Sequence, residues 1–500
     1  MPLDVTQAAT PTQAQQQAAA GVERAEQPAL DPRTRRLLEG SIAATLLRLA
    51  APNVLVMVVQ SSVQLIETYF VGRLGTDALA GMALVFPVVM LMQMMSAGAI
   101  GNGIAAAVAR ALGAGRRSDA DRLVLHALTV AFVCGLFFSA AVLGGGPFLY
   151  AAMGGSGESL RAALTYSDIV FAGMVLVWSF NALANVLRGS GNMIVPAAVS
   201  CIGTLVLLPL SPALILGWGP FPRLGIAGGA VSFLLFYAAG NMALALYLLA
   251  GRSVVRPRLR GRLEWRLFHD ILRVGAVSAL ITLQTNLTIG ITTGLVGSFG
   301  AASIAGYGIG TRLEYLLVPL IFGFGAPLVA MVGTNIGAGN SARALRSAWI
   351  GTAIAFALAE TIGLCAAAFP HAWLSLFDSD PAMLAVGSLY LQTVGPFYGL
   401  FGVGLALNFA SQGAGQMRWP LLAALSRLLV AAGGGYLALR WTGGLFGVFA
   451  ALSLALAGFG LVNAAAVAGG AWFGPLCLAA IFRPRLHLSA VPPKPLPIEP

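Results

Sequence analysis

Long apolar runs, separated by short turns rich in Gly, Pro or Arg, dominate this chain from about residue 44 onward. A run of about 20 apolar residues is long enough to cross the hydrocarbon core of a bilayer as a helix. The pattern therefore predicts an all-α polytopic membrane protein with twelve transmembrane helices. The predicted helices lie near residues 44–70, 78–109, 122–144, 163–187, 193–217, 225–250, 269–298, 302–336, 345–369, 383–411, 417–439 and 445–472.

An internal repeat divides these helices into two sets of six. Adding 224 to Gly189, Gly191, Met193 and Pro196 gives Gly413, Gly415, Met417 and Pro420, and the same offset maps Gly113-Ala114-Gly115 onto Gly337-Ala338-Gly339. An offset of 225 maps Arg48 onto Arg273 and Gly72 onto Gly297. Because six is even, both halves enter the membrane from the same side. Parallel repeats of this kind are a transporter architecture with the site near the middle of the membrane.

The composition supports a membrane protein and excludes most other classes. Hydrophobic residues make up 58% of the chain, charged residues only 9%, and the mean hydropathy is +0.84. A soluble fold has too little interior to bury so much apolar surface. The net charge of +11 comes from Arg in short connectors, which is typical of topology signals rather than of nucleic-acid binding.

The distribution of Arg also predicts the orientation. With a cytoplasmic N-terminus, the outside connectors hold only Arg73, Arg161, Arg223 and Arg440, and most other Arg residues fall inside. Both termini are therefore expected in the cytoplasm, with the protein in the bacterial inner membrane. The predicted domains are a disordered cytoplasmic tail (1–40), an N-lobe (41–250), a basic cytoplasmic linker (251–268), a C-lobe (269–472) and a cytoplasmic tail (473–500).

Enzymatic chemistry has no recognisable motif in this sequence. The single lysine, Lys494, lies in the C-terminal tail, so the chain has no P-loop and no direct use of ATP. The cysteines are far apart and the histidines scattered, which argues against a disulfide framework or a metal site. We expect no enzymatic activity, no bound metal and no cofactor.

Glu67 is the clearest candidate for a functional charge inside the membrane. A carboxylate at membrane depth costs about 3 kcal/mol, so such residues usually have a function. Asn53, Gln60, Gln64 and Glu67 fall at spacings of seven, four and three, which places them on one face of a helix. A polar stripe that ends in a carboxyl group is suited to carry a proton or a sodium ion. The alternative is that Glu67 is solvated near the helix end or pairs with Arg73.

Other polar residues are weaker candidates. The repeat places Ser278, Thr285 and Thr292 opposite Asn53, Gln60 and Glu67, so the second stripe carries no charge. Asn181 and Asn185 share a helix face and either line the cavity or hydrogen-bond between helices. Arg312 and Glu314 lie two residues apart on different faces. Each is a candidate for the second-half cavity or for a gate between the halves.

Four segments of the chain carry distinctive motifs: Glu67-Thr-Tyr-Phe-Val-Gly-Arg-Leu-Gly, Leu187-Arg-Gly-Ser-Gly-Asn, Gly308-Ile-Gly-Thr-Arg-Leu-Glu and Val332-Gly-Thr-Asn-Ile-Gly-Ala-Gly. Together these segments resemble the multidrug and toxic compound extrusion (MATE) family, in particular its DinF-like prokaryotic branch. The resemblance implies two lobes around a V-shaped central cavity, and Glu67 stands where that branch has a cation-binding Asp. A second family Asp is replaced by Ser211, which favours coupling to H⁺ over Na⁺.

The predicted function is secondary active antiport, with export of cationic or amphipathic organic compounds coupled to inward H⁺, or less favourably Na⁺. The alternative is a lipid-linked oligosaccharide flippase, whose anionic substrate would call for more cationic cavity residues than Arg312 and Arg427. The expected partners are small organic molecules and the lipid bilayer. No nucleic acid and no obligatory protein partner is expected, and the transporter is predicted to be a monomer.

Overall fold

The computed structural model describes residues 31–258, 261–377 and 379–472, without the side chains of residues 61–68, 301, 315, 316, 318 and 319. Every regular element within these residues is a helix. The first half contains α2 (Pro32–Glu39), α3 (Ile42–Gly72), α4 (Thr76–Gln93), η1 (Met94–Ile100), α5 (Gly101–Gly113), α6 (Arg117–Ala152), α7 (Gly157–Ala172), α8 (Met174–Gly189), α9 (Ile194–Leu216) and α10 (Ile226–Leu249). The second half contains α11 (Trp265–Gly297), α12 (Ala301–Gly337), α13 (Ser341–Ala368), α14 (Pro370–Leu374), α15 (Pro381–Val394), η2 (Gly395–Phe397), α16 (Tyr398–Ala414), α17 (Arg418–Leu428), η3 (Leu429–Gly434), α18 (Gly435–Thr442) and α19 (Leu445–Ala468).

These helices confirm the predicted membrane spans. Eleven are long and apolar enough to cross a bilayer, and the bent pair α7 and α8 brings the number to 12 among the described residues. The bend of 49° lies at Gly173. Adding the repeat offset of 224 to this residue gives position 397, where η2 interrupts the α15–α16 span in the second half. Both halves therefore break the corresponding helix at the same place.

The repeated glycines have a conformational reason. Gly115 and Gly339 have φ values of 72° and 73°, and Gly191 and Gly415 have φ values of 78° and 75°. Residues with a side chain rarely adopt this left-handed conformation, whereas glycine adopts it readily. The sequence repeat is thus a repeat of turn geometry at the ends of equivalent helices. It is strong evidence that the halves share one fold.

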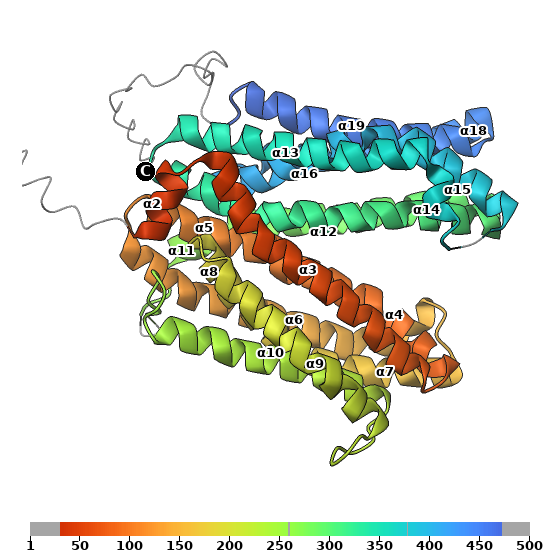
Figure 1. Ribbon diagram of the computed structural model, residues 1–500, viewed down its shortest axis with the longest axis horizontal. Coiled ribbons are helices and arrows are strands. Elements are labelled where there is room, and N and C mark those ends of the chain that lie inside the picture. Colours follow the sequence, from red (N-terminus) through yellow and green to blue (C-terminus); the bar gives the residue numbers. More distant parts are fainter. Residues whose placement is uncertain (1–30, 259–260, 378, 473–500) are drawn as a thin grey trace, which may run out of the picture.

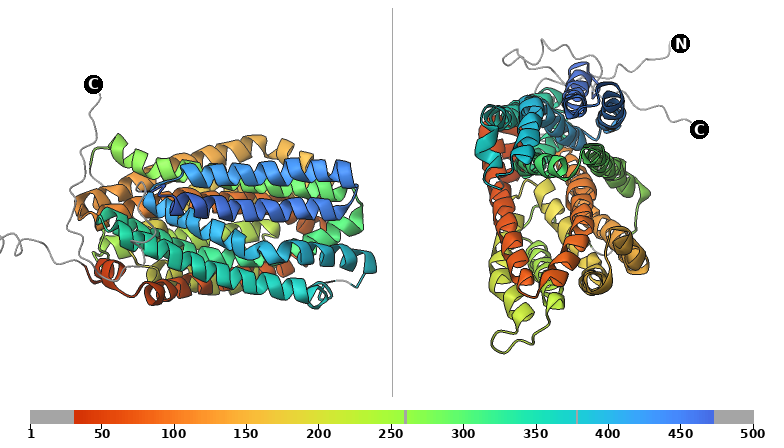
Figure 2. Two further views of the ribbon diagram at one scale, coloured as in Figure 1. Left: turned by 90° about the horizontal axis from the view of Figure 1, so that it is seen from above. Right: turned by 90° about the vertical axis from the view of Figure 1, so that its right-hand side faces the viewer.

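Two helical lobes lie side by side and diverge toward one end (Figure 1). One hydrophobic core is made mostly by α5 to α11, and a second mostly by α11 to α19. In the end-on view the two halves occupy separate parts of the molecule (Figure 2). Helix α3 is an exception, because it packs against α9 of its own half and α12 of the other.

The lobes meet where α5, α8, α12 and α16 end, on the left of Figure 1. We call this the Arg-rich end, because the turns there are flanked by Arg116, Arg188, Arg343 and Arg418. Helix α5 packs closely against α12 at this end. The predicted Arg bias therefore corresponds to one end of the structure.

The prediction of a disordered tail over residues 1–40 is wrong for its last part, which forms helix α2. Asp31 accepts a hydrogen bond from the backbone N–H of Arg33 (2.9 Å), and Pro32 occupies the first helical position. Leu37 is buried in the second-half core, and its carbonyl accepts a hydrogen bond from Asn335 (3.1 Å). The helix is amphipathic but too short to produce a clear periodic pattern. Residues 1–30 and the predicted tail at 473–500 lie outside the described residues.

Candidate functional site

Helix α3 carries the predicted polar stripe. The side chains of Glu67 and Gln64 lie outside the described residues, although their backbone belongs to α3. Asn53 is buried, and its Nδ2 atom lies 3.5 Å from the carbonyl oxygen of Gly323 on α12, to which it donates a hydrogen bond. Gln60 is exposed. The stripe thus starts at a contact between the two lobes, and its role in ion coupling stays a prediction.

Asn181 and Asn185 connect α8 to the π-helical segment η1. Asn181 donates a hydrogen bond to the hydroxyl of Ser96 (2.8 Å), and Asn185 donates to the carbonyls of Ala97 (3.2 Å) and Asn181 (2.9 Å). A π-helical turn disturbs the regular backbone ladder, so its carbonyls are available to outside donors. The sequence left two alternatives for these residues, a cavity lining or hydrogen bonds between helices. The structure shows the hydrogen bonds between helices. A role in lining a cavity stays a prediction.

Ser211 lies on α9, one of the helices that pack against α3. It is buried, and its hydroxyl has no hydrogen-bond partner among the described residues. Such a group is unfavourable unless water or an ion occupies the site in some state of the protein. The supporting role of Ser211 in the N-lobe stays a prediction.

Thr285 and Thr292 bond within their own helix. Each hydroxyl donates to the carbonyl four residues earlier on α11, Ile281 for Thr285 and Thr288 for Thr292, at 2.9 Å. This is the usual way in which Thr satisfies its hydroxyl inside an apolar helix. Among the described residues, no hydrogen bond joins either hydroxyl to a charged group, and their cavity role stays a prediction.

Arg312 and Glu314 face different partners, as their spacing on α12 predicts. The Arg312 guanidinium lies 5.3 Å from the ring centre of Phe377, and the residue is exposed. Glu314 points into the second lobe, where its Oε2 atom accepts a hydrogen bond from the hydroxyl of Tyr390 (3.2 Å). Only Glu314 therefore belongs to an internal polar site.

Glu314, Tyr307, Tyr390, Tyr398 and Arg427 form a polar cluster inside the second lobe, which we call the Glu314 cluster. The hydroxyl of Tyr398 donates to that of Tyr390 (3.4 Å), and the rings of Tyr307 and Tyr390 meet edge to face at 5.3 Å. Arg427 is buried and attracts the Glu314 carboxylate electrostatically. The cluster joins α12, α15, α16 and α17. It can hold a proton or stabilise a charge in an otherwise apolar bundle.

The sequence indicates Glu314 as a candidate but does not indicate its tyrosine partners. Tyr307 precedes Glu314 by seven residues, which places both on one face of α12. Tyr390 and Tyr398 lie more than 70 residues further along the chain, and nothing in their local sequence indicates that they meet Glu314. Arg427 is held over the rings of Phe401 (5.0 Å) and Phe459 (5.7 Å). Such cation–π contacts depend on tertiary packing.

Replacing Glu314 with Gln should destabilise the second lobe, because Arg427 loses the negative charge that compensates it. We expect a loss of about 1–3 kcal/mol in the free energy of unfolding, the usual effect of removing a charged hydrogen-bond partner. The measurement is the thermal unfolding midpoint in detergent. Adding Arg427→Met should recover part of the loss, since no buried charge is then unpaired. An equal shift in the exposed control Glu158→Gln would contradict this role.

A resident metal ion has no site in the part of the chain that the structure describes. No group of three or more His, Cys, Asp or Glu side chains that could hold a metal is found there. Among the described side chains, the carboxyl group of Glu314 lies next to Tyr390 and is attracted by Arg427.

Comparisons with known proteins give one consistent family. The MatE family model matches residues 52–213 and 278–437, the two halves of the repeat. A probable multidrug resistance protein NorM of Deinococcus radiodurans is 32% identical over 395 residues, which cover 76% of this chain and 84% of that protein. An FAD transporter of Shewanella oneidensis is 28% identical over 375 residues, which cover 73% of this chain and 81% of that protein.

Solved structures agree with the sequence relatives. A multidrug resistance MATE family transporter in an outward-facing conformation matches with a TM-score of 0.77 and 25% identity, over 86% of this chain and 95% of that one. A MATE protein in complex with MaD3S matches with a TM-score of 0.78 and 25% identity, over 86% and 96%. The matches span both six-helix lobes, and the family consists of transporters, not enzymes. This chain belongs to the MatE family of multidrug and toxic compound extrusion transporters.

Proposed function

We propose that this chain is a secondary active antiporter that exports cationic or amphipathic organic compounds, coupled to the inward movement of protons through Glu67. One observation carries the proposal: α3, the helix that bears Glu67, packs against both α9 and α12. A change of charge on a helix shared by two lobes alters the energy of their contact. This is the differential interaction that alternating access requires.

The proposed cycle follows from that position. Substrate enters a cavity open to the cytoplasm while Glu67 is charged. Closure at the Arg-rich end and opening at the far end allow a proton from outside to neutralise Glu67. Neutralisation favours release of the substrate and the return of the lobes. One carboxyl group can bias the equilibrium by at most a few kcal/mol, so transport depends strongly on this group.

The proposed location is the bacterial inner membrane, with both termini in the cytoplasm and the transporter active as a monomer. The support is that Arg110, Arg116, Arg188, Arg343 and Arg418 lie in or beside the helix ends that form the Arg-rich end. Cytoplasmic connectors carry an excess of Arg and Lys in membrane proteins. The Arg-rich end is then the cytoplasmic end.

Glu314 is a second candidate for the coupling group, favoured by its bond to Tyr390 and its attraction to Arg427. Protonation of Glu314 would remove the charge that compensates Arg427 and so loosen the second lobe. Glu360 is a weaker candidate, because its Oε2 atom already accepts a hydrogen bond from the backbone N–H of Gly399 (2.8 Å). That hydrogen bond gives a partner to one of the backbone N–H groups in the first turn of α16, which have none within the helix.

Transport in proteoliposomes tests the proposal. Vesicles that contain the purified chain are given either a proton gradient or a sodium gradient, and the movement of ethidium and norfloxacin is recorded. We expect transport with the proton gradient alone. Transport with only the sodium gradient would replace protons by sodium as the coupling ion. No drug transport with either gradient would overturn the proposal. Because a relative is named FAD transporter, FAD is then the next compound to test.

A further inference from the structure

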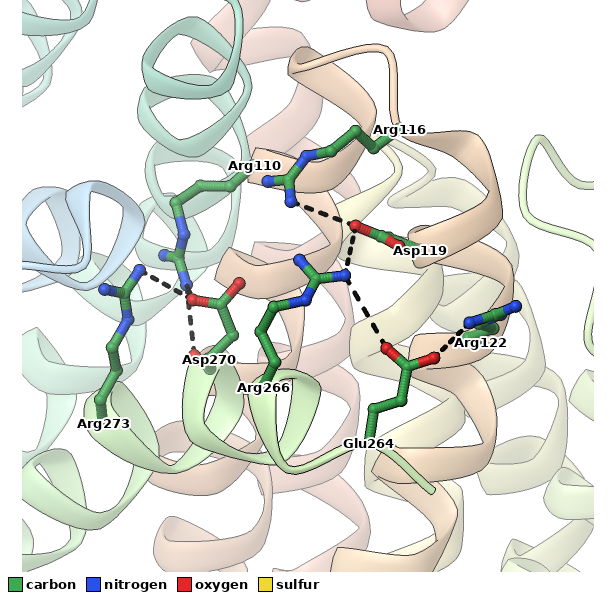
Figure 3. A network of polar contacts seen from close by, with 8 residues as sticks. All are labelled: Arg110, Arg116, Asp119, Arg122, Glu264, Arg266, Asp270 and Arg273. Atoms are coloured by element: carbon green, nitrogen blue, oxygen red, sulfur yellow. Dashed lines mark hydrogen bonds and ion pairs between the residues drawn. The ribbon is translucent and has the colours of Figure 1, made fainter. Parts of the chain in front are cut away.

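Eight charged side chains form a network at the Arg-rich end (Figure 3). Asp119 accepts from Arg116 and from Arg266, each at 3.1 Å. Asp270 pairs with Arg273 (2.8 Å) and more loosely with Arg110 (3.7 Å). Glu264 pairs with Arg122 and lies 3.9 Å from Arg266. Five guanidinium groups thus share three carboxylates, which leaves two positive charges uncompensated within this set.

An open cavity of about 650 Å³ lies beside the network. Arg110, Arg116, Arg266, Arg273, His269 and Asp270 line it, together with the last residues of α12. Its volume falls in the usual range for small-molecule sites, about 300–1,000 Å³. Four of these six lining side chains are Arg and one is an acid, so the cavity favours an anion.

Arg110 is the rigid residue of the cavity lining. Its side chain is only 7% exposed, and its guanidinium donates to the carbonyls of Gly413 (3.1 Å) and Asp270 (3.2 Å). Its Nε atom has no partner among the described residues. The side chains of Arg266 and Arg273 are 55% and 41% exposed, so each guanidinium can turn from its carboxylate partner toward a ligand. A rigid guanidinium beside two adjustable ones suits an anion with several oxygen atoms.

We propose that this cavity binds a phosphate-bearing anion, which compensates the two excess Arg charges. The guanidinium fork matches the geometry of phosphate oxygens and bonds them in pairs. The cavity lies at the membrane end that carries the Arg-rich turns, where either a lipid headgroup or a soluble phosphate compound can reach it. Both sources present the same chemistry to the four Arg residues.

The bound anion also links the lobes. Arg110 and Arg116 belong to α5 and the turn that follows it, whereas the last residues of α12 belong to the other lobe. In this structure α5 and α12 pack together, so the Arg-rich end is closed. A ligand held between them binds the closed form more tightly and therefore favours it. The site thus adds a control on the transport cycle that is independent of the drug and of the coupling ion.

Binding of two probes to the full-length protein tests the proposal. The first is inorganic phosphate, titrated into detergent-purified protein against chloride at equal ionic strength, with the thermal unfolding midpoint as readout. The second is phosphatidylglycerol in nanodiscs, with retention of the lipid measured by native mass spectrometry. We compare Arg266→Gln, Arg273→Gln and Ala114→Trp with the control Arg161→Gln. Arg161 is exposed and paired with Glu158 (3.1 Å), outside the cavity.

The expected result is about tenfold weaker binding in each Arg variant of the cavity, the effect of one charged hydrogen bond, with no change in the control. Ala114 also lines the cavity. Ala114→Trp should therefore weaken binding as well, because the larger side chain fills the cavity and removes no charge. Phosphate binding without lipid assigns the site to a soluble phosphate compound, and retention of phosphatidylglycerol alone assigns it to a headgroup. Binding of neither probe, or equal loss in Arg161→Gln, overturns the proposal.

Discussion

Replacing Glu67 with Gln should abolish drug extrusion driven by a proton gradient, whereas Glu67→Asp should retain most of it. Gln has nearly the same size but cannot bind and release a proton, so the two states of the cycle lose their difference in charge. A coupling of a few kcal/mol corresponds to a factor of about a hundred or more in the equilibrium between states. We therefore expect at least about a hundredfold loss in the rate of norfloxacin extrusion.

Two controls separate loss of coupling from loss of structure. Drug affinity of the purified Glu67→Gln variant should stay close to that of the wild type, since the substrate does not have to bind Glu67. Glu158→Gln removes an exposed carboxylate on α7 and should leave transport unchanged. If Glu67→Gln transports as fast as the wild type, coupling does not pass through this residue. The same assay on Glu314→Gln then tests the second lobe.

The helices and their repeat could be predicted from the sequence because both depend on local properties. The length of an apolar run is fixed by the thickness of the bilayer. Glycines such as Gly191 and Gly415 recur because each turn needs a left-handed residue at the same place. Neither property requires knowledge of which helices touch.

The internal partners could not be predicted, because they come from distant parts of the chain. Tyr390 meets Glu314 across 76 residues, and Arg110 meets Asp270 across 160. From its sequence position Arg110 is a topology signal, and in the structure it is also buried between the lobes, where it bonds to Gly413. Asn185 has two possible roles in the sequence, and only the position of η1 identifies its hydrogen-bond acceptor. The number of charged residues in a connector indicates on which side of the membrane a helix ends. It does not indicate which helices pack against it.

Close contact between the lobes at the Arg-rich end depends on two repeat-related glycines. A Cβ atom on Gly113 would overlap the carbonyl oxygen of Thr334, and one on Gly337 would overlap that of Arg110. A backbone carbonyl cannot move aside in the way a flexible side chain can. The helices α5 and α12 can therefore approach this closely only while both positions lack side chains.

Gly113→Ala and Gly337→Ala should each open the Arg-rich end, because the added methyl group forces α5 away from α12. Overpacking of this kind costs about 1–3 kcal/mol, and only the closed state bears the cost. The population of the closed state relative to the open one should fall by a factor of about 5 to 150. Spin labels at Ser118 and Ala338, both exposed beside this contact, report the change as a longer distance between the labels.

Gly144→Ala is the matched control, since its Cβ atom would meet nothing within 4 Å. If all three variants give the wild-type distance distribution, the glycine contact does not determine closure. Closure must then depend on the Arg network at the same end.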